Sequence, residues 1–295
     1  MKIAIVGAGF CGVAAAYHLS RTGHQVKIFD DKGLGGGASG VATGLLHPYP
    51  GKEGRLSWMG YEAMQASREL LGVAEQALGK PVADYSGILR VTESKRFDHY
   101  PDVEKVGDNT YLIKSGITVF SNLYLEGLFK ASNVELVSKK ISSLQELSDF
   151  DFIVLAVGYG IREFAECAHL NLRYVKGQVL TCKHDLEKSI IENGYRAVTE
   201  RPGICHVGAT YERSFTNGEE CKETAVNLLN PQFEVVDCKA GVRVANAAGY
   251  HPSVEKVKDN CFAITGLGSR GLLYHALIQN DLSAAILSPA TFRRQ

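Results

Sequence analysis

The sequence predicts an α/β fold in which a doubly wound, Rossmann-like dinucleotide-binding domain is interleaved with a second, β-rich domain. Three observations lead to this prediction. The N-terminal segment reads as strand, glycine-rich turn, helix and strand. The continuous apolar run over residues 152–157 is typical of a parallel strand that is buried on both faces. Alternating, turn-rich sequence fills residues 85–118 and 173–245 and predicts the β-rich part.

The elements follow from local sequence patterns. Short apolar runs bounded by glycine or charge indicate strands, and apolar residues at helical spacing indicate helices. In the first half of the chain we expect strand 1–6, a helix that runs through Leu19 and ends near Gly23, strand 26–29, a long amphipathic helix from about 56 to 78, and strands within 85–118. In the second half we expect strands 134–137 and 152–157, strands within 173–245 with one helix near 219–229, strand 262–265, and helix 272–287.

Gly7-x-Gly9-x-x-Gly12 lies between the first strand and the first helix. The first glycine permits a tight turn, the second lets a pyrophosphate approach the backbone, and the third lets the helix pack on the strand. The N-terminus of the helix then offers free N–H groups to the phosphate. Asp30 ends the second strand, where a carboxylate accepts hydrogen bonds from a ribose. The alternative is a glycine-rich turn of an unrelated α/β fold.

Two further glycine loops accompany this fingerprint. Residues 35–40, Gly-Gly-Gly-Ala-Ser-Gly, bring backbone N–H groups and the Ser39 hydroxyl toward the same pyrophosphate, or form a flexible loop. Residues 266–271 repeat the G-x-G-x-x-G pattern, but too little chain remains for a second βαβ unit. We expect this C-terminal loop to meet the other end of the same cofactor. The absence of a second complete Rossmann unit argues against bound NADPH.

Composition excludes several classes of protein. Lys plus Arg and Asp plus Glu are both 32, so the zero net charge gives no general attraction for nucleic acids or anionic membranes. The seven cysteines are scattered without a C-x-x-C pair, which indicates neither a disulfide framework nor a zinc site. The sequence has no run of 18 apolar residues, so we expect no membrane span. We therefore expect a cytoplasmic protein with reduced thiols and no metal or membrane partner.

The chain resembles the D-amino-acid oxidase (DAO) family of FAD-dependent oxidoreductases over nearly its whole length. The fingerprint, the Gly-Gly-Ala-Ser loop, the strand into Ala156-Val157-Gly158 and the C-terminal loop carry this resemblance. Within the family it most resembles the FAD-dependent C-terminal domain of the MnmC tRNA-modification proteins. That similarity rests on residues 38–48, 208–215 and 267–272.

The resemblance implies a glutathione-reductase-like FAD-binding domain that is discontinuous in sequence. We expect residues 1–84, 119–172 and 256–295 in the FAD-binding domain, and residues 85–118 and 173–255 in the substrate domain. FAD is the expected cofactor. The implied FAD-binding residues are Gly7, Ala8, Gly9, Phe10, Cys11, Gly12, Asp30, Asp31, Gly37, Ala38, Ser39, Gly40, Leu46, His47, Ile141, Ala156, Val157, Gly158, Gly268, Ser269, Arg270, Gly271 and Leu272.

The resemblance also implies residues that act on the substrate: Arg243, Arg270, Tyr211 and His47. Arg243 matches the position where glycine oxidase-like relatives hold the substrate carboxylate, and a planar guanidinium suits that task; the alternative is a salt bridge between the two domains. Arg270 contacts substrate or caps its loop. His47 lies on the expected path of the flavin or packs as a buried polar group. Tyr211 belongs to the segment expected to roof the flavin.

The implied activity is oxidation of a C–N bond by hydride transfer from an amine to flavin N5, giving an imine that hydrolyses. The resemblance to MnmC suggests the carboxymethylaminomethyl group of a tRNA wobble uridine as substrate. Two alternatives stay open at this point. One is an oxidase of a small glycine- or sarcosine-like amine, and the other is a flavin-binding protein without turnover. The sequence leaves the electron acceptor and the oligomeric state undetermined.

Overall fold

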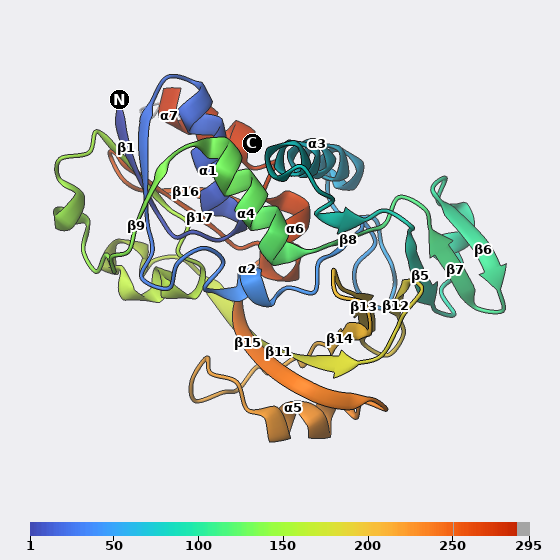
Figure 1. The fold of residues 1–295 in the computed structure, drawn as a ribbon. Coiled ribbons are helices and arrows are strands. Elements are labelled where there is room, and N and C mark those ends of the chain that lie inside the picture. The colour runs from blue at the N-terminus through green and yellow to red at the C-terminus, as the bar shows by residue number, and fades with distance from the viewer. Residues whose placement is uncertain (250, 288–295) are drawn as a thin grey trace.

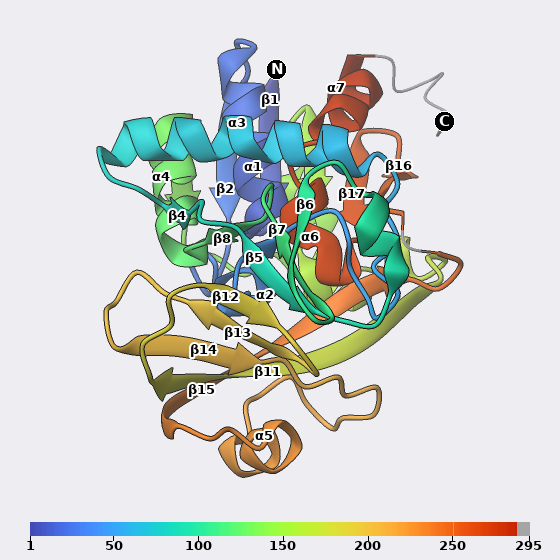
Figure 2. The same ribbon diagram turned by 90° about the vertical axis from the view of Figure 1, so that its right-hand side faces the viewer.

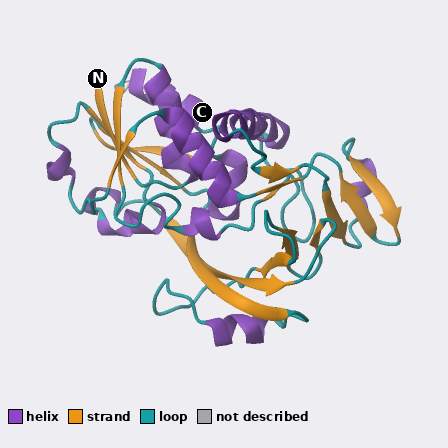
Figure 3. Ribbon diagram, in the orientation of Figure 1, coloured by secondary structure: helices purple, strands orange, loops and turns teal. Residues whose placement is uncertain are grey.

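The computed structural model describes residues 1–249 and 251–287, and its strands form three sheets (Figure 1). A six-stranded sheet lies beside a group of helices, and an eight-stranded sheet extends from it as a long curved arm. Figure 3 shows that the long helices gather at the first sheet, whereas the second sheet is mostly strand and loop. The predicted mixture of a parallel α/β part and a β-rich part is therefore confirmed.

The six-stranded sheet has the order β16-β17-β10-β1-β2-β9. Its central strands pair in parallel, and only the edge strand β16 runs antiparallel to its neighbour. The bounds are β1 Lys2–Val6, β2 Gln25–Phe29, β9 Glu135–Val137, β10 Phe152–Leu155, β16 Ser253–Lys258 and β17 Cys261–Thr265. β10 and β17 are buried at every residue, as expected for strands covered on both faces.

Alternate residues of β1 enter two different cores. Ile3 and Ile5 pack on the side of helices α1 (Phe10–Arg21) and α7 (Gln279–Leu287). Ala4 and Val6 face the opposite side, which is covered by short 3₁₀ turns between residues 144 and 167. This period of two places the β1 side chains from Ile3 to Val6 in the cores on the two faces of the sheet.

Helices α3 (Gly60–Leu78) and α4 (Ser121–Ser132) pack beside α1. Figure 2 shows α3 lying across the helical layer, with the second sheet on the far side of α2 (Ala38–Val41). Two short helices complete the set: α5 (Lys222–Leu229) and α6 (Gly271–Tyr274).

The eight-stranded sheet has the order β15-β11-β14-β13-β12-β5-β7-β6. Its two longest strands, β11 (Leu172–Lys183) and β15 (Glu234–Asn246), pair antiparallel along almost their whole length. The other bounds are β5 Ile88–Val91, β6 Val103–Gly107, β7 Thr110–Ile113, β12 Ser189–Ile191, β13 Tyr195–Val198 and β14 Ile204–Gly208. A small sheet joins β3 (Leu45–Leu46), β8 (Ile117–Val119) and β4 (Ala83–Asp84).

Three predicted helix boundaries are wrong. The long helix begins at Gly60 rather than residue 56, because residues 56–59 turn and Met59 adopts a left-handed backbone conformation. The helix near 219–229 begins at Lys222. The C-terminal helix is interrupted between α6 and α7, where the Gln279 side chain donates to the carbonyl of His275 (2.6 Å).

The predicted division into two domains stays a prediction. The six-stranded sheet takes its strands from residues 2–29, 135–155 and 253–265, and the eight-stranded sheet from residues 88–113 and 172–246. Residues 288–295 of the last predicted FAD-binding segment lie outside the described residues.

Candidate functional site

The fingerprint turn depends on close backbone contacts that exclude side chains. Gly7 has a φ of +106° and donates its N–H to Phe29 O (2.8 Å). A Cβ on Gly7 would lie 2.4 Å from Ala156 O, and a Cβ on Gly12 would lie 1.9 Å from Gly7 O. The first and third glycines therefore pack β1, α1 and the end of β10 against one another, as the motif predicts.

The second glycine loop is tied directly to this turn. Gly35 N donates to Ala8 O (2.9 Å), and the Ser39 hydroxyl accepts from Phe10 N (3.0 Å) at the first turn of α1. A Cβ on Gly9 would lie 2.8 Å from Ser39 Oγ. Because that hydroxyl already accepts the Phe10 N–H, its own hydrogen remains available to an acceptor such as a phosphate oxygen.

Asp30 holds the turn from the end of β2. Its Oδ2 accepts from Ala8 N (2.8 Å), and its Oδ1 accepts from Lys32 N (2.8 Å). A carboxylate offers about four lone-pair positions, so capacity remains for ribose hydroxyls. Asp31 is exposed. The geometry therefore favours Asp30 over Asp31 as the ribose acid.

A cavity of about 440 Å³ lies between the C-terminal ends of the parallel strands and the second sheet. The predicted site residues that line it are Gly9, Phe10, Cys11, Ala38, Ser39, His47, Ala156, Gly158, Tyr211, Arg243, Gly268, Ser269, Gly271 and Leu272. The predicted residues outside its wall are Gly7, Ala8, Gly12, Asp30, Asp31, Gly37, Gly40, Leu46, Ile141, Val157 and Arg270. Gly7, Gly12 and Asp30 belong to the fingerprint turn next to this wall, whereas Ile141 is buried in the core that also holds Ala4 and Val6.

Arg243 enters the cavity from β15 and lies over a glycine of the neighbouring strand. A Cβ on Gly177 of β11 would lie 2.1 Å from Arg243 Nη2. Within residues 1–249 and 251–287 the guanidinium forms no hydrogen bond and no ion pair, so no inter-domain salt bridge is present there. An arginine remains charged. Its charge is therefore available to an anion in the cavity.

Three residues that the sequence did not single out line the same cavity: Arg90, Tyr195 and Thr265. Burial raises the pKa of Tyr195, while Arg243 and a hydrogen bond with Thr43 lower it. Arg90 lies on the buried face of β5 together with Ile88. In a strand whose buried and exposed residues alternate, a charged residue at a buried position is the sequence signal that could have identified Arg90 as a site residue.

The cavity wall fits a cofactor that presents hydrogen-bonding atoms. The Thr265 hydroxyl at the end of β17 is enclosed and has no partner among the described residues. Buried polar groups are normally hydrogen-bonded, so this hydroxyl indicates a missing partner. Gly266 and Gly268 follow with φ of +81° and +56°, which leaves backbone rather than side chains facing that end of the cavity.

His47 is neutral in this setting. Desolvation and, to a smaller extent, nearby Arg90 lower its pKa to about 4, against the opposing effect of Asp102. Its Nδ1 accepts a hydrogen bond from Tyr49 N (3.2 Å), which leaves the proton on Nε2. His47 can therefore donate one hydrogen bond into the cavity.

Arg270 and Tyr211 differ in their surroundings. Arg270 lies in the 3₁₀ turn Gly268–Arg270 outside the cavity wall, and its charge lowers the pKa of Tyr274, which burial raises. Tyr211 is 62% exposed at the cavity mouth. The predicted substrate contacts of both residues stay predictions.

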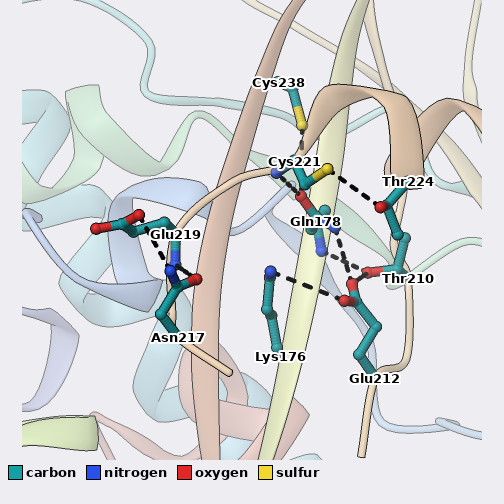
Figure 4. Close-up of polar contacts among 9 residues, drawn as sticks. All are labelled: Lys176, Gln178, Thr210, Glu212, Asn217, Glu219, Cys221, Thr224 and Cys238. Carbon is teal, nitrogen blue, oxygen red and sulfur yellow. Dashed lines mark hydrogen bonds and ion pairs between the residues drawn. The ribbon is translucent and has the colours of Figure 1, made fainter. Parts of the chain in front are cut away.

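A polar network between β11 and residues 210–212 fixes the segment that contains Tyr211 (Figure 4). The backbones of Lys176 and Glu212 exchange two hydrogen bonds (3.0 and 2.9 Å), and their side chains form a buried ion pair (3.8 Å). The Gln178 amide donates to Glu212 Oε1 (3.0 Å), and Gln178 N donates to the Thr210 hydroxyl (2.8 Å). These contacts seat residues 209–212 beside the cavity.

Other features of the described chain carry less chemistry. A larger hollow of about 800 Å³ lies at the opposite end of the parallel strands, and its wall holds Arg21 and His24 as well as Glu135 and Asp149. Those charges do not converge on one group. None of the described helices has both the length and the apolar character needed to cross a membrane. Among the described residues, no three His, Cys, Asp or Glu side chains cluster as metal ligands.

Comparison with known proteins supports the same interpretation. Residues 2–115 match the family model for DAO, described as FAD dependent oxidoreductase. The chain is 23% identical to the tRNA 5-methylaminomethyl-2-thiouridine biosynthesis bifunctional protein MnmC of Campylobacter jejuni subsp. doylei, over 82% of this chain and 44% of that protein. It is 24% identical to the MnmC protein of Acinetobacter baylyi, over 97% of this chain and 53% of that protein. The chain thus spans about half the length of these curated relatives.

Solved structures show the same fold. Glycine oxidase from Geobacillus kaustophilus superposes with a TM-score of 0.80 at 17% identity, over 100% of this chain and 96% of that one. Iminodiacetate oxidase from Chelativorans sp. BNC1 gives a TM-score of 0.74 at 18% identity, over 99% of this chain and 97% of that one. The predicted fold class is confirmed.

Proposed function

We propose that this chain, an FAD-dependent oxidoreductase of the DAO family, oxidises a C–N bond of an amine that carries a carboxylate. The substrate we propose is the carboxymethylaminomethyl group of a tRNA wobble uridine. Support for that substrate comes from the MnmC relatives, whose name describes biosynthesis of a modified tRNA uridine. The single observation that carries the proposal is the unpaired Arg243 guanidinium in the wall of the cavity.

The residues of the cavity wall fit FAD. When bound, FAD supplies the two-electron acceptor for the C–H bond next to the amine nitrogen. The N-terminus of α1 and the Ser39 hydroxyl are suited to the pyrophosphate, and Asp30 to the adenosine ribose. At the other end, Thr265 and the backbone of residues 266–271 are available to the ring system.

Arg243 orients the substrate in this proposal. A guanidinium binds both oxygens of a carboxylate through parallel N–H donors, which fixes direction as well as position. The reacting carbon then keeps one distance and angle to the acceptor, and such orientation contributes much of the rate in two-reactant steps. Neutral His47 and Tyr195 provide further donors at the wall without adding charge.

A small-molecule amine oxidase is the second candidate function. Its support is the likeness in fold to glycine oxidase and iminodiacetate oxidase, together with a carboxylate anchor that serves a free amino acid equally well. A flavin-binding protein without turnover is the third candidate. No specific observation favours it, because the unpaired Arg243 guanidinium in the cavity is the feature expected of a substrate site.

Mass spectrometry of tRNA nucleosides separates these candidates. The chain is expressed in a strain that lacks the oxidase activity of MnmC, with an Arg243→Met variant as control. We expect the carboxymethylaminomethyl nucleoside to be consumed only with the unmodified chain. An unchanged nucleoside pool together with peroxide release from glycine or sarcosine would support the small-molecule oxidase instead. Failure of both substrates to reduce the bound flavin would support the protein without turnover.

A further inference from the structure

A second guanidinium reaches the cavity from β5. Arg90 is only 8% exposed, and its Nη2 donates to the carbonyls of Gly51 (2.8 Å) and Lys52 (3.3 Å). Its Nε is enclosed without a partner, and no carboxylate pairs with it in the described part of the chain. Its guanidinium also lies 5.9 Å from the centre of the Phe97 ring. Buried charges are normally paired, so an uncompensated cation in a cavity wall indicates an external anion.

One carboxylate, that of Asp102, acts on the same histidine as Arg90. The charge of Asp102 raises the pKa of His47, and the charge of Arg90 lowers it. The two carboxylate oxygens of Asp102 accept hydrogen bonds from the Tyr49 and Ser115 hydroxyls, however, and Asp102 forms no ion pair with Arg90 within the described residues. Arg90 therefore has no carboxylate in ion-pair contact among the described residues.

Arg90 and Arg243 lie on one face of the eight-stranded sheet, on strands that are five places apart in its order. Arg90 is in register with Ile191 of β12, which is in register with Tyr195 of β13, and all three line the cavity. The two cations also influence different groups: Arg90 acts on His47 and Arg243 on Tyr195. The two guanidinium groups therefore provide two cationic positions in the wall of one cavity.

We propose that Arg90 binds a second anionic group of the substrate, namely a phosphate of the nucleotide whose amine-bearing side chain is anchored by Arg243. The inference rests on the proposed function. A nucleotide of this kind carries its carboxylate on the base side chain and its phosphates on the ribose, so it presents two separate anionic groups to the two arginines of the cavity. The planar donor fork of arginine matches a phosphate as it matches a carboxylate. The competing role for Arg90 is purely structural, as a clamp on residues 51–52.

The first test measures binding without chemistry. Uridine 3′,5′-bisphosphate, which lacks the amine and its carboxylate, is titrated by calorimetry into the FAD-loaded protein. A charge-assisted contact of this kind changes affinity by roughly tenfold to a hundredfold, so Arg90→Gln is expected to weaken binding about thirtyfold. Arg21→Gln removes an exposed arginine from the far end of α1 and is the matched control. A larger loss of binding in Arg243→Met than in Arg90→Gln would place the phosphate at Arg243 and overturn the assignment to Arg90.

The second test measures anaerobic flavin reduction by 5-carboxymethylaminomethyluridine and by its 3′,5′-bisphosphate. The unmodified chain should need a lower concentration of the bisphosphate for half-maximal reduction, and Arg90→Gln should abolish that preference. If neither compound reduces the flavin but Arg90→Gln still weakens binding of uridine bisphosphate, the proposed function fails and the anion site stands. If Arg90→Gln binds the bisphosphate as the unmodified chain does, the anion site is wrong.

A structural role would give a different result. Loss of FAD or of the melting transition in Arg90→Gln would point to the clamp on residues 51–52. Arg90→Lys then decides, because it keeps the charge and one donor to the carbonyls. A folded, FAD-loaded Arg90→Lys that binds uridine bisphosphate about tenfold more weakly supports the proposal, since ammonium lacks the bidentate fork. Unaltered binding in the lysine variant, together with a Gln variant that does not fold, overturns it.

Discussion

The guanidinium of Arg243 lies over Gly177, with Nη2 where the Cβ of any larger residue at position 177 would have to be. The two residues belong to the paired strands β15 and β11, with Val175 opposite Arg243 and Gly241 opposite Gly177. Because Gly177 has no side chain, the Arg243 side chain can pack directly against its backbone and extend into the cavity. This relationship explains why a glycine occupies the middle of a long strand, where it is otherwise unfavourable.

Gly177→Ala is expected to displace the arginine without unfolding the chain. The new methyl group would lie 2.1 Å from Nη2, and the guanidinium is the mobile end of a flexible side chain. We expect retention of FAD and a melting temperature within a few degrees of the original. The amine concentration for half-maximal flavin reduction should rise about tenfold, which corresponds to about 1.4 kcal/mol. Gly72→Ala, where nothing lies within 4 Å of the new methyl group, is the control. An unchanged concentration dependence in Gly177→Ala would contradict this account.

Arg243→Met should impair the substrate step while the cofactor stays bound. Because the guanidinium forms no ion pair with the described residues, its removal leaves no carboxylate of the described chain without a partner. Loss of one partner from a buried anion contact costs roughly 2–5 kcal/mol, so substrate-driven flavin reduction should fall at least about thirtyfold. Stopped-flow absorbance at the flavin band measures this rate. Loss of FAD or of the folded state would instead reveal a structural role for Arg243, and a parental rate would exclude the carboxylate anchor.

Local sequence predicted the cofactor side of the molecule well. Gly7, Gly12 and Asp30 belong to one βαβ unit, so their positions follow from local spacing, whereas the contact of Gly7 with Ala156 joins the turn to a distant strand end. The substrate side depends on strand order. Arg90 and Tyr195 share a face because β5 and β13 both pair with β12, and β12 runs parallel to β5. No local pattern specifies that non-consecutive pairing, which is why both residues were missed.

The interrupted C-terminal helix shows a second limit. Apolar spacing over residues 272–287 is continuous and predicts one helix. In the structure, the buried His275 ring contacts Leu272 O (2.8 Å) through Nδ1 and the Tyr124 hydroxyl through Nε2, at the point where α6 ends. These tertiary contacts with a helix more than a hundred residues away override the local preference.

The same His275 should make stability depend on pH. Burial lowers its pKa to about 4 from an ordinary value of 6.5, against a smaller raising effect of the Leu272 carbonyl. The unfolded chain therefore binds more protons between these values, and this stabilisation is complete above pH 6.5 and is lost as the pH falls toward 4. The difference is about 3 kcal/mol. Urea unfolding at pH 7 and pH 4.5 measures it. His275→Gln should flatten the slope and exposed His99→Gln should not; equal slopes in both variants would contradict the assignment.

Asp30→Ala should release FAD and also loosen the turn that binds it. The carboxylate receives Ala8 N and Lys32 N, so its loss removes two charge-assisted hydrogen bonds besides the proposed ribose contact. One such bond contributes about 1.5–3 kcal/mol, which predicts a roughly tenfold to hundredfold loss of FAD affinity. Flavin absorbance per chain after gel filtration, and the flavin released on denaturation, measure retention and identity. Asp31→Ala is the matched control, because that neighbouring side chain is exposed, and we expect it to keep the yellow cofactor. The ribose role passes to Asp31 if only its variant loses FAD, and fails altogether if both variants remain fully loaded.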